Sequence, residues 1–494
     1  MYRVACNKEK LISHDSRHAS PALHDSRFAL HDAGYIVISV VVFGSVFLTI
    51  LGGLVGFVFL QTRAQGIKET REKALQIAEA GLDYYKWHLA HFPNDLMNGA
   101  TTSGPIIVPY RDPEGDVIGE FELGLASEQY CGQTNTVSIT ATGTASVDPS
   151  IERVVYARYA RPSVASYAYI LNSNVWAGSD RQISGNYHSN GGIRMDGTND
   201  SLVTSAVSTW LCTSSFGCSP SSTTPGVWGG GPNFTLWQQP LPQIDFAGIT
   251  TDLAQIKTLA VAQGVYINET SNSDQRGIRL RFNADGTVTR WRVTGTSAHS
   301  SQHVDTGSTW HSDYDVITAT QNQTTFTIPA DCPVIFVEAK TWIDGVITQK
   351  VIVAADEIVS PSSRADVILN GNITYADNTG LDGLTVIADR SVLIPFNSPN
   401  DMTLNGIFIA QSGYFGRNYY PSSEGTGYLR NSLTVSGTIV SNGREGTKWS
   451  SGGTVVSGYQ LRTNAYDQDL SVSPPPLTPT ISDEFTFLEW QEVE

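Results

Sequence analysis

The residues best suited to hold a metal ion lie in one stretch near the middle of the 494-residue chain. His299 and His303 are four positions apart, so on a β-strand their side chains would share one face. Further candidates follow closely at Asp305, His311, Asp313 and Asp315. Imidazole and carboxylate groups are ordinary metal ligands. Because the stretch is rich in Ser, Thr and Gly, we expect a flexible loop and predict no metal site.

The cysteines suggest a chain that is exported from the cytoplasm and forms disulfide bonds. Cys212 and Cys218 close a short loop, which is typical of a local disulfide in an exported protein. Cys131 and Cys332 are the other two that remain if an N-terminal leader, with Cys6, is removed. Four cysteines allow three connectivities, so a Cys131–Cys332 pair stays open, as does the alternative of free buried thiols.

Catalytic motifs are otherwise absent from the sequence. It contains no phosphate-binding loop, dinucleotide fingerprint, His-Glu-x-x-His or nucleophile elbow. Asp285, Asp377 and Asp382 lie in Asn/Asp/Gly turns, where a carboxylate binds calcium or, more commonly, caps the backbone. Trp228 and Trp237 suit stacking on sugars, but packing is the better interpretation. We therefore predict no enzyme activity, no catalytic residue, no cofactor and no metal.

The elements that carry these residues begin with a hydrophobic helix. The run from Gly34 to Leu60 has no charged residue and exceeds the roughly 20 apolar residues that a bilayer-spanning helix needs. We expect a single-pass transmembrane helix. Four basic residues follow it, at Arg63, Lys68, Arg71 and Lys73. Taken alone, the positive-inside rule would place the C-terminal side in the cytoplasm.

The helix is predicted to continue beyond the membrane to residue 92. No proline occurs from Gln61 to Phe92, and apolar residues recur there at helical spacing. We expect this stripe to pack on the next domain; it comprises Ile67, Ala74, Ala78, Leu82, Tyr85 and Leu89. The sequence thus predicts one helix over residues 35–92, with a membrane half and an amphipathic stalk.

A short antiparallel β meander is expected next. Val117–Leu125, Thr136–Thr144 and Ile151–Ala160 are rich in strand-forming residues, and the last two alternate apolar with polar positions. Asp148-Pro149-Ser150 supplies a turn. A long helix followed by such a meander is an α+β module, in a chain that is mainly β overall.

This arrangement resembles the type IV pilins, and more specifically minor pilin-like proteins with a PilX-type N-terminal domain. The resemblance rests on the Gly34-Tyr35 junction, the stalk stretch 74–82 (ALQIAEAGL) and the stretch 140–155 (TATGTA…RVV). It implies that prepilin peptidase cuts after Gly34, that Tyr35 becomes the N-terminus, and that the bulk of the chain lies outside the cytoplasm, at the cell surface or on a pilus.

The resemblance also implies the partners of the chain. These are other pilin subunits, inner-membrane pilus assembly proteins, prepilin peptidase and membrane lipid. Major pilins carry Glu at the fifth mature position, where this chain has Ser39. That departure fits an initiating or tip subunit. The residues before Gly34 are Asp32 and Ala33, where the family often has basic residues.

The distal region repeats a short phrase of an apolar residue, a small polar residue, Gly, any residue and an apolar residue. It occurs at 183–187, 343–347, 369–373, 404–408 and 435–439. Short aliphatic strands with Gly at tight corners are typical of a right-handed parallel β-helix. The irregular spacing leaves a β sandwich as the alternative.

We expect an insertion within this β domain. It contains the Cys212/Cys218 pair, a helix with Ile249 and Ile256 on its apolar face, and a hairpin of 277–282 with 287–293. The predicted organisation is 1–34 leader, 35–92 helix, 93–165 meander, 166–209 start of the solenoid, 210–330 insertion, 331–473 solenoid and 474–494 C-terminal strap.

The charge balance restricts the partners. The chain has 31 Lys and Arg against 47 Asp and Glu, a formal net charge of −16. Nucleic-acid binding needs clustered Lys and Arg, so no nucleic-acid partner is expected.

Three functions fit the sequence, and we favour the first. It is a membrane-anchored minor pilin that displays a β domain. The second is a surface adhesin outside any filament, with a surface ligand or glycan as partner. The third is a polysaccharide-acting β-helix enzyme, which would need clustered Asp with a catalytic Arg or Lys.

Overall fold

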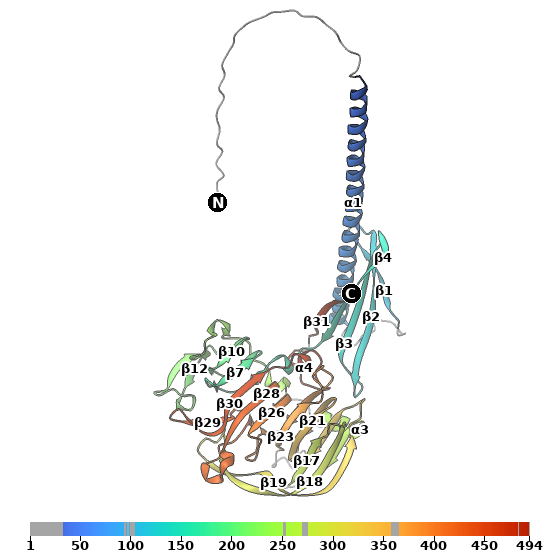
Figure 1. Ribbon diagram of the computed structural model, residues 1–494. Coiled ribbons are helices and arrows are strands. Elements are labelled where there is room, and N and C mark those ends of the chain that lie inside the picture. The colour runs from blue at the N-terminus through green and yellow to red at the C-terminus, as the bar shows by residue number, and fades with distance from the viewer. Residues whose placement is uncertain are drawn as a thin grey trace, which may run out of the picture. The chain divides into compact units, whose positions relative to one another are not determined.

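The protein, described by a computed structural model, has one long helix and is otherwise dominated by β structure (Figure 1). The structure describes residues 33–493 apart from 93–94, 96–97, 99–103, 250–252, 269–274, 357–364 and 483. The chain divides into two compact units, residues 1–69 and 70–494. The α+β, mainly β fold class predicted from the sequence is confirmed.

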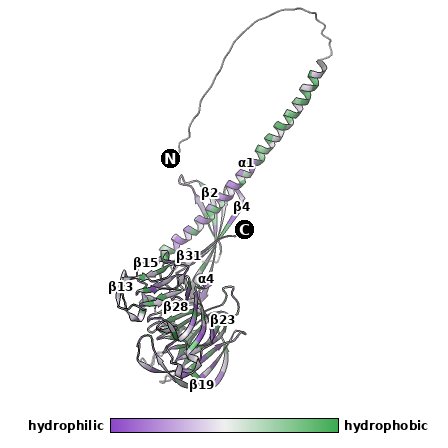
Figure 2. Ribbon diagram, turned by 60° about the vertical axis from the view of Figure 1, so that its left-hand side comes forward, coloured by the Kyte–Doolittle hydropathy of each residue, from purple (hydrophilic) through white to green (hydrophobic). Residues whose placement is uncertain are grey.

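Helix α1 (Ala33–His91) is 59 residues long and nearly coincides with the predicted 35–92. Pro93, expected to end it, lies outside the described residues. In the first unit its large apolar side chains are exposed on every face, and Figure 2 shows hydrophobic residues along it. Its buried stripe begins in the second unit at Thr70, and Ala74, Ala78 and Leu82 are almost fully buried.

The C-terminal part of α1 packs on a five-stranded antiparallel sheet. The strand order is β1 (Ile106–Arg111), β2 (Val117–Tyr130), β3 (Gln133–Ala145), β4 (Asp148–Ala160) and β31 (Thr486–Val493). Small residues set the contact between helix and sheet, because a Cβ at Gly143 would overlap backbone atoms of Ala74 and Ala78. The Ala-rich stalk and the TATGT stretch therefore meet where the two backbones approach each other.

Gly143→Ala should lower the free energy of unfolding of this module by about 1–3 kcal/mol, because the added methyl group meets rigid helix backbone. Gly124→Ala on the neighbouring strand is the matched control, since its nearest neighbour would be 3.8 Å away. Denaturant unfolding of both variants measures the difference. Equal stabilities would contradict the close-contact interpretation.

The C-terminal segment differs from the prediction. Residues 474–494 were expected to form a strap, but β31 is the fifth strand of the sheet and pairs antiparallel with β4. Opposite charges support the pairing, with Arg153 bound to Glu492 and Arg158 3.7 Å from Glu489. The large β domain, residues 161–482, is therefore inserted between two neighbouring strands of the sheet.

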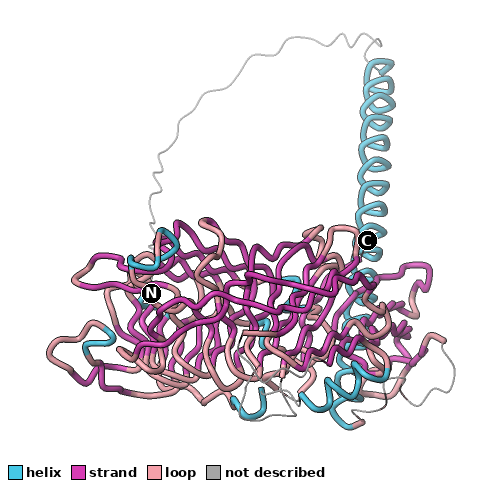
Figure 3. Tube along the Cα trace, turned by 90° about the horizontal axis from the view of Figure 1, so that it is seen from below, coloured by secondary structure: helices cyan, strands magenta, loops and turns pink. Residues whose placement is uncertain are grey.

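The large domain is a stack of parallel strands, which Figure 3 shows as the strand-rich body of the molecule. One continuous parallel ladder runs through β16 (Val265–Asn268), β20 (Val334–Glu338), β22 (Lys350–Ala355), β24 (Gly383–Ala388), β26 (Asp401–Ala410), β28 (Leu429–Ser441), β5 (Tyr169–Leu171), β8 (Tyr187–Ser189), β11 (Val203–Ser205) and β15 (Trp237–Gln238).

A second parallel ladder runs through β17 (Gly277–Phe282), β21 (Thr341–Ile347), β23 (Val367–Tyr375), the first halves of β26 and β28, β30 (Thr454–Ala465), β7 (Arg181–Ser184) and β10 (Thr198–Asn199). The aliphatic side chains between the ladders form the largest core cluster of the described residues. Parallel stacking, rather than the sandwich alternative, therefore organises this domain.

The repeated phrase marks a corner of the coil. Gly406 and Gly437 are paired in register, and their φ angles are 142° and 134°. In this region an L side chain is strained. A Cβ at Gly437 would also overlap the carbonyl of Gly406. The glycine lets both strands bend from one ladder into the next. Gly185 and Gly345 of the phrase also have positive φ angles, 105° and 123°, whereas Gly371 does not.

The order of coils differs from the predicted domain list. Strand β5, near the start of the domain, stacks on β28, near its end. Residues 210–330 are not an insertion between neighbouring coils, because β15 lies at one end of the first ladder and β16 at the other. The expected helix is matched only in part: Ile256 lies on α3 (Leu253–Ala262), which packs beside β16 and β20, whereas Ile249 is the last residue of a separate short helix, α2 (Phe246–Ile249). The expected hairpin of β17 with β18 (Thr287–Gln302) is present.

Candidate functional site

The most unusual surface of the molecule is the N-terminal part of α1. Tyr35 is 78% exposed and Leu60 70% exposed, and the large apolar residues between them are exposed as well. Among the described residues, α1 is long and apolar enough to cross a membrane. Arg63 is the first charged side chain after this run. Burial of each large apolar side chain in lipid contributes roughly 1.5–3 kcal/mol, so this surface favours an apolar environment.

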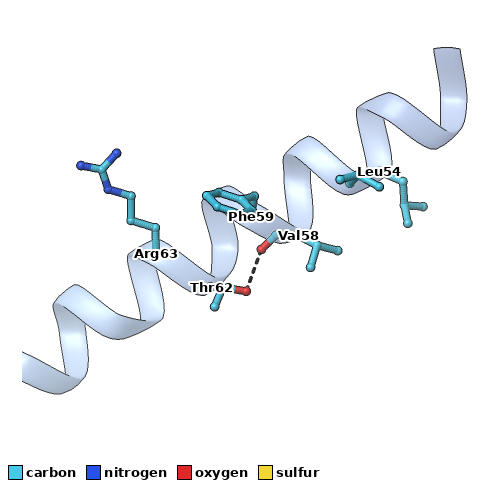
Figure 4. A pocket seen from close by; sticks show the side chains of 6 residues that line it. Leu54, Val58, Phe59, Thr62 and Arg63 are labelled. Atoms are coloured by element: carbon cyan, nitrogen blue, oxygen red, sulfur yellow. Dashed lines mark hydrogen bonds between the residues drawn. The ribbon is translucent and has the colours of Figure 1, made fainter.

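The polar side chains of this segment are adapted to an apolar environment. Ser45 donates to the carbonyl of Val42 at 2.8 Å, and Thr49 donates to that of Ser45 at 2.7 Å. Thr62 donates to Val58 at 2.9 Å, beside the exposed ring of Phe59 (Figure 4). Hydroxyl groups bonded to their own helix need no water, which suits a membrane.

The structure places the proposed processing site at the start of this helix. Gly34 is the second residue of α1, and Tyr35 follows it. The rest of the predicted leader, residues 1–32, lies outside the described residues. The predicted stalk residues separate into two groups. Tyr85 and Leu89 are buried with the residues named above, whereas Ile67 is 42% exposed and belongs to the first unit.

Two disulfides join the four cysteines of the described chain. Cys212 bonds to Cys218 across a short loop, as the sequence predicted. Cys131 bonds to Cys332 across a sequence separation of 201 residues. Cys131 lies in the β2–β3 turn, and its N–H donates to the carbonyl of Asp331 at 2.8 Å. The tip of this hairpin is thus attached covalently to the solenoid.

The His/Asp stretch is ordered, contrary to the expected flexible loop. It forms the distal ends of β18 and β19 (Trp310–Thr327), which pair antiparallel. His303 is hydrogen-bonded to Asp313 at 2.8 Å, and Asp313 also accepts from Asn418 and Tyr420. The described part of the chain has no group of three or more His, Cys, Asp or Glu residues placed to hold a metal. Instead, Asp313 on β19 links the hairpin to the solenoid through its hydrogen bonds with Asn418 and Tyr420.

This pair should make the hairpin pH-dependent. Burial lowers the pKa of His303, but the hydrogen bond to Asp313 and the charges of Asp313, Asp305 and Asp315 outweigh it and raise the pKa above 6.5. The hydrogen bonds from His303 and Asn418 outweigh burial at Asp313 and lower its pKa below 3.8. The stabilisation is therefore complete below pH 6.5 and is lost as the pH rises through the pKa of His303. On the acid side it is lost as the pH falls through that of Asp313.

Hydrogen exchange of β18 and β19, corrected for intrinsic rates, should show protection falling by on the order of 1 kcal/mol as His303 deprotonates. His303→Gln should remove this dependence. His91→Gln, at an exposed histidine of α1, should leave it unchanged. A pH dependence that survives His303→Gln would assign it to another group.

The other candidate ligands have structural contacts. Asp285 accepts from the backbone N–H and the hydroxyl of Thr287, as a turn cap does. Trp237 packs against the solenoid core, and Trp228 packs against the Cys212–Cys218 cluster. These contacts agree with the packing interpretation of both tryptophans.

Comparisons with known proteins add little. No protein family and no curated protein matches the chain. Among solved structures, it is similar to the competence-associated pilin ComZ from Thermus thermophilus, with 12% sequence identity and a TM-score of 0.29, covering 86% of this chain and 97% of that one. A TM-score this low does not establish a shared fold.

Proposed function

We propose that this protein is a membrane-anchored, minor pilin-like subunit with no catalytic activity, which displays its solenoid domain at the cell surface or filament tip. The observation that carries the proposal is the division of α1. Its N-terminal part is apolar and exposed on every face, and its C-terminal part buries one stripe on an antiparallel sheet. The apolar part of α1 can therefore pass from the bilayer into a bundle of other helices, while the packing of its C-terminal part on the sheet stays unchanged.

The sheet gives the display domain a firm base. Because the solenoid is inserted between β4 and β31, both of its chain ends enter one sheet. The Cys131–Cys332 bond adds a third covalent connection. Three connections suit a domain that has to resist pulling. Ser39 in place of the usual acidic residue supports a position at the start or tip of a filament.

The proposal includes processing after Gly34, which leaves the bulk of the chain outside the cytoplasm. The partners are prepilin peptidase, membrane lipid, other pilin subunits and the inner-membrane assembly proteins. N-terminal mass analysis of the full chain from cells that contain the peptidase tests this directly. We expect a mature N-terminus at Tyr35. An intact Met1 would contradict the processing step.

A matched pair of variants tests the junction. Gly34→Val should abolish cleavage and remove the protein from sheared surface filaments. Gly44→Val makes the same change deeper in the apolar helix, where no atom lies within 4 Å of the added Cβ, and should leave cleavage unchanged. Wild-type protein that is processed yet stays in membranes and never enters filaments would favour the surface adhesin.

A further inference from the structure

A polar pocket of 260 Å³ lies between the corner of the solenoid and helix α4 (Gln468–Val472). Asn405 and Ser436 line it, and both occupy the small polar position of the repeated phrase, just before Gly406 and Gly437. The turn that carries Asn378 and the start of α4 complete the wall. The repeat therefore builds one side of the pocket, and a helix outside the ladders builds the other.

Several polar groups that line the pocket are free to bind a ligand. Within the described part of the chain, no side-chain hydrogen bond to another protein group joins Asn378, Asn405, Ser436, Tyr466 or Asp469, of which Asn378 and Asp469 are exposed and the others half-buried. They supply amide donors and acceptors, hydroxyls and a carboxylate from four separate segments. Polar groups of this kind can fix the orientation of a small molecule that fills the hollow.

The charge of the pocket selects among ligands. Asp382, Asp467 and Asp469 line it, and no Lys or Arg does so among the described residues. Burial raises the pKa of Asp467, and the neighbouring Asp469 raises it further. A pocket lined by carboxylates repels phosphates, sulfates and sugar acids, attracts positively charged molecules and does not exclude neutral ones.

The carboxylates are not arranged for a metal ion. Asp467 caps the N-terminus of α4 by accepting from the N–H groups of Asp469 and Leu470, and Asp382 accepts from the N–H of Asp377 at 2.9 Å. No group of three acidic, His or Cys side chains within the described ranges could hold a metal. The separated carboxylates and amides instead fit a ligand that carries several hydroxyl groups around a ring.

We propose that this pocket binds one pyranose ring without negative charge, and an amino sugar most tightly. The hydroxyl groups would donate to the carboxylates and to the Asn378 and Asn405 amide oxygens, and a ligand ammonium group would lie near Asp469. The volume is below the range typical of drug-sized ligands, which limits the occupant to about one ring. This proposal rests on the proposed function in one respect only: the pocket is displayed outside the cell only if the solenoid domain is.

The test uses the full chain in detergent and three trisaccharides, measured by calorimetry. We expect the glucosamine trimer to bind at least tenfold more tightly than cellotriose, and trigalacturonate not to bind. Asp469→Asn should reduce the preference for the glucosamine trimer about tenfold, and Asn405→Ala should weaken both ligands about threefold to tenfold. Glu114→Gln, the same charge change at a remote turn, should alter neither.

Three results would overturn the proposal. The first is no binding of any trisaccharide by a folded wild-type chain. The second is binding that survives Asp469→Asn and Asn405→Ala but is lost in Trp310→Ala, which would move the site to the exposed Trp310 ring beside Tyr419. The third is binding of calcium alone that Asp469→Asn abolishes.

The sugar-binding proposal and the proposed function can be rejected independently of each other. The unprocessed Gly34→Val chain should bind the glucosamine trimer as the wild type does, because the pocket lies wholly within the second unit. Loss of binding with normal filament entry would reject only the sugar site.

Discussion

Replacing Cys131 and Cys332 together by alanine should lower the free energy of unfolding of the second unit by up to about 5 kcal/mol. The two residues are separated by 201 positions, so their bond closes a very long loop in the unfolded chain. In the chain-entropy description the stabilisation grows with the logarithm of loop length, and this loop lies near the upper end of that range. Denaturant unfolding under non-reducing conditions measures the loss.

The second disulfide provides a matched control. Cys212 and Cys218 are separated by only 6 positions, and both are also buried. The same double alanine change there should cost about 3 kcal/mol less, from the ratio of the two loop lengths. Equal losses would show that entropy of the unfolded chain does not explain the Cys131–Cys332 bond, and that local packing does.

Local patterns made the helix and the short hairpins predictable. The limits of α1 follow from an uncharged run, a stripe at helical spacing and the absence of proline, all of which can be read from one continuous stretch of sequence. The same holds for the pairing of Gly277–Phe282 with Thr287–Val293 through an Asn-Ala-Asp-Gly turn. Ile67 is the exception in the stripe, because helical spacing alone does not say where the partner surface begins.

Long-range pairing was not predictable from such patterns. Strand β31 joins β4 across more than 300 residues of inserted chain, and the only local sign of it is the opposite charge of Arg153 and Arg158 on β4 and of Glu489 and Glu492 on β31. Likewise, β5 pairs in parallel with β28, and neither strand carries a sequence pattern that predicts this partner.

The hairpin of β18 and β19 shows why composition misled. Ser, Thr and Gly are typical of loops, but a Thr-rich strand is also stable when its polar side chains are fastened by partners from elsewhere. Here those partners are Asn418 and Tyr420, more than 100 positions away from Asp313. The pocket at α4 is a similar case, because Asn405 and Ser436 become binding groups only when the coils stack.

A buried ion pair gives the second large effect. Arg181 on β7 is bound to Glu445, and their side chains are only 3% and 2% exposed. Arg181 also donates to Tyr169 and to Asn464. It therefore joins segments from the start and from the end of the domain's sequence. Although burial opposes its charge, Glu445 raises the pKa of Arg181 above its usual value.

Arg181→Met should therefore lower the free energy of unfolding by about 3–5 kcal/mol, because it removes the ion-pair partner of the buried Glu445 carboxylate.

The double variant Arg181→Met/Glu445→Met separates the charge pair from the packing. It should recover much of the loss, because removing both charges also removes the desolvation cost. Thermal or denaturant unfolding of the two single variants and the double variant gives the coupling energy. A double variant as unstable as the sum of the single variants would mean that the charges do not interact, and that each is needed for its own hydrogen bonds to Tyr169, Asn464 and Thr447.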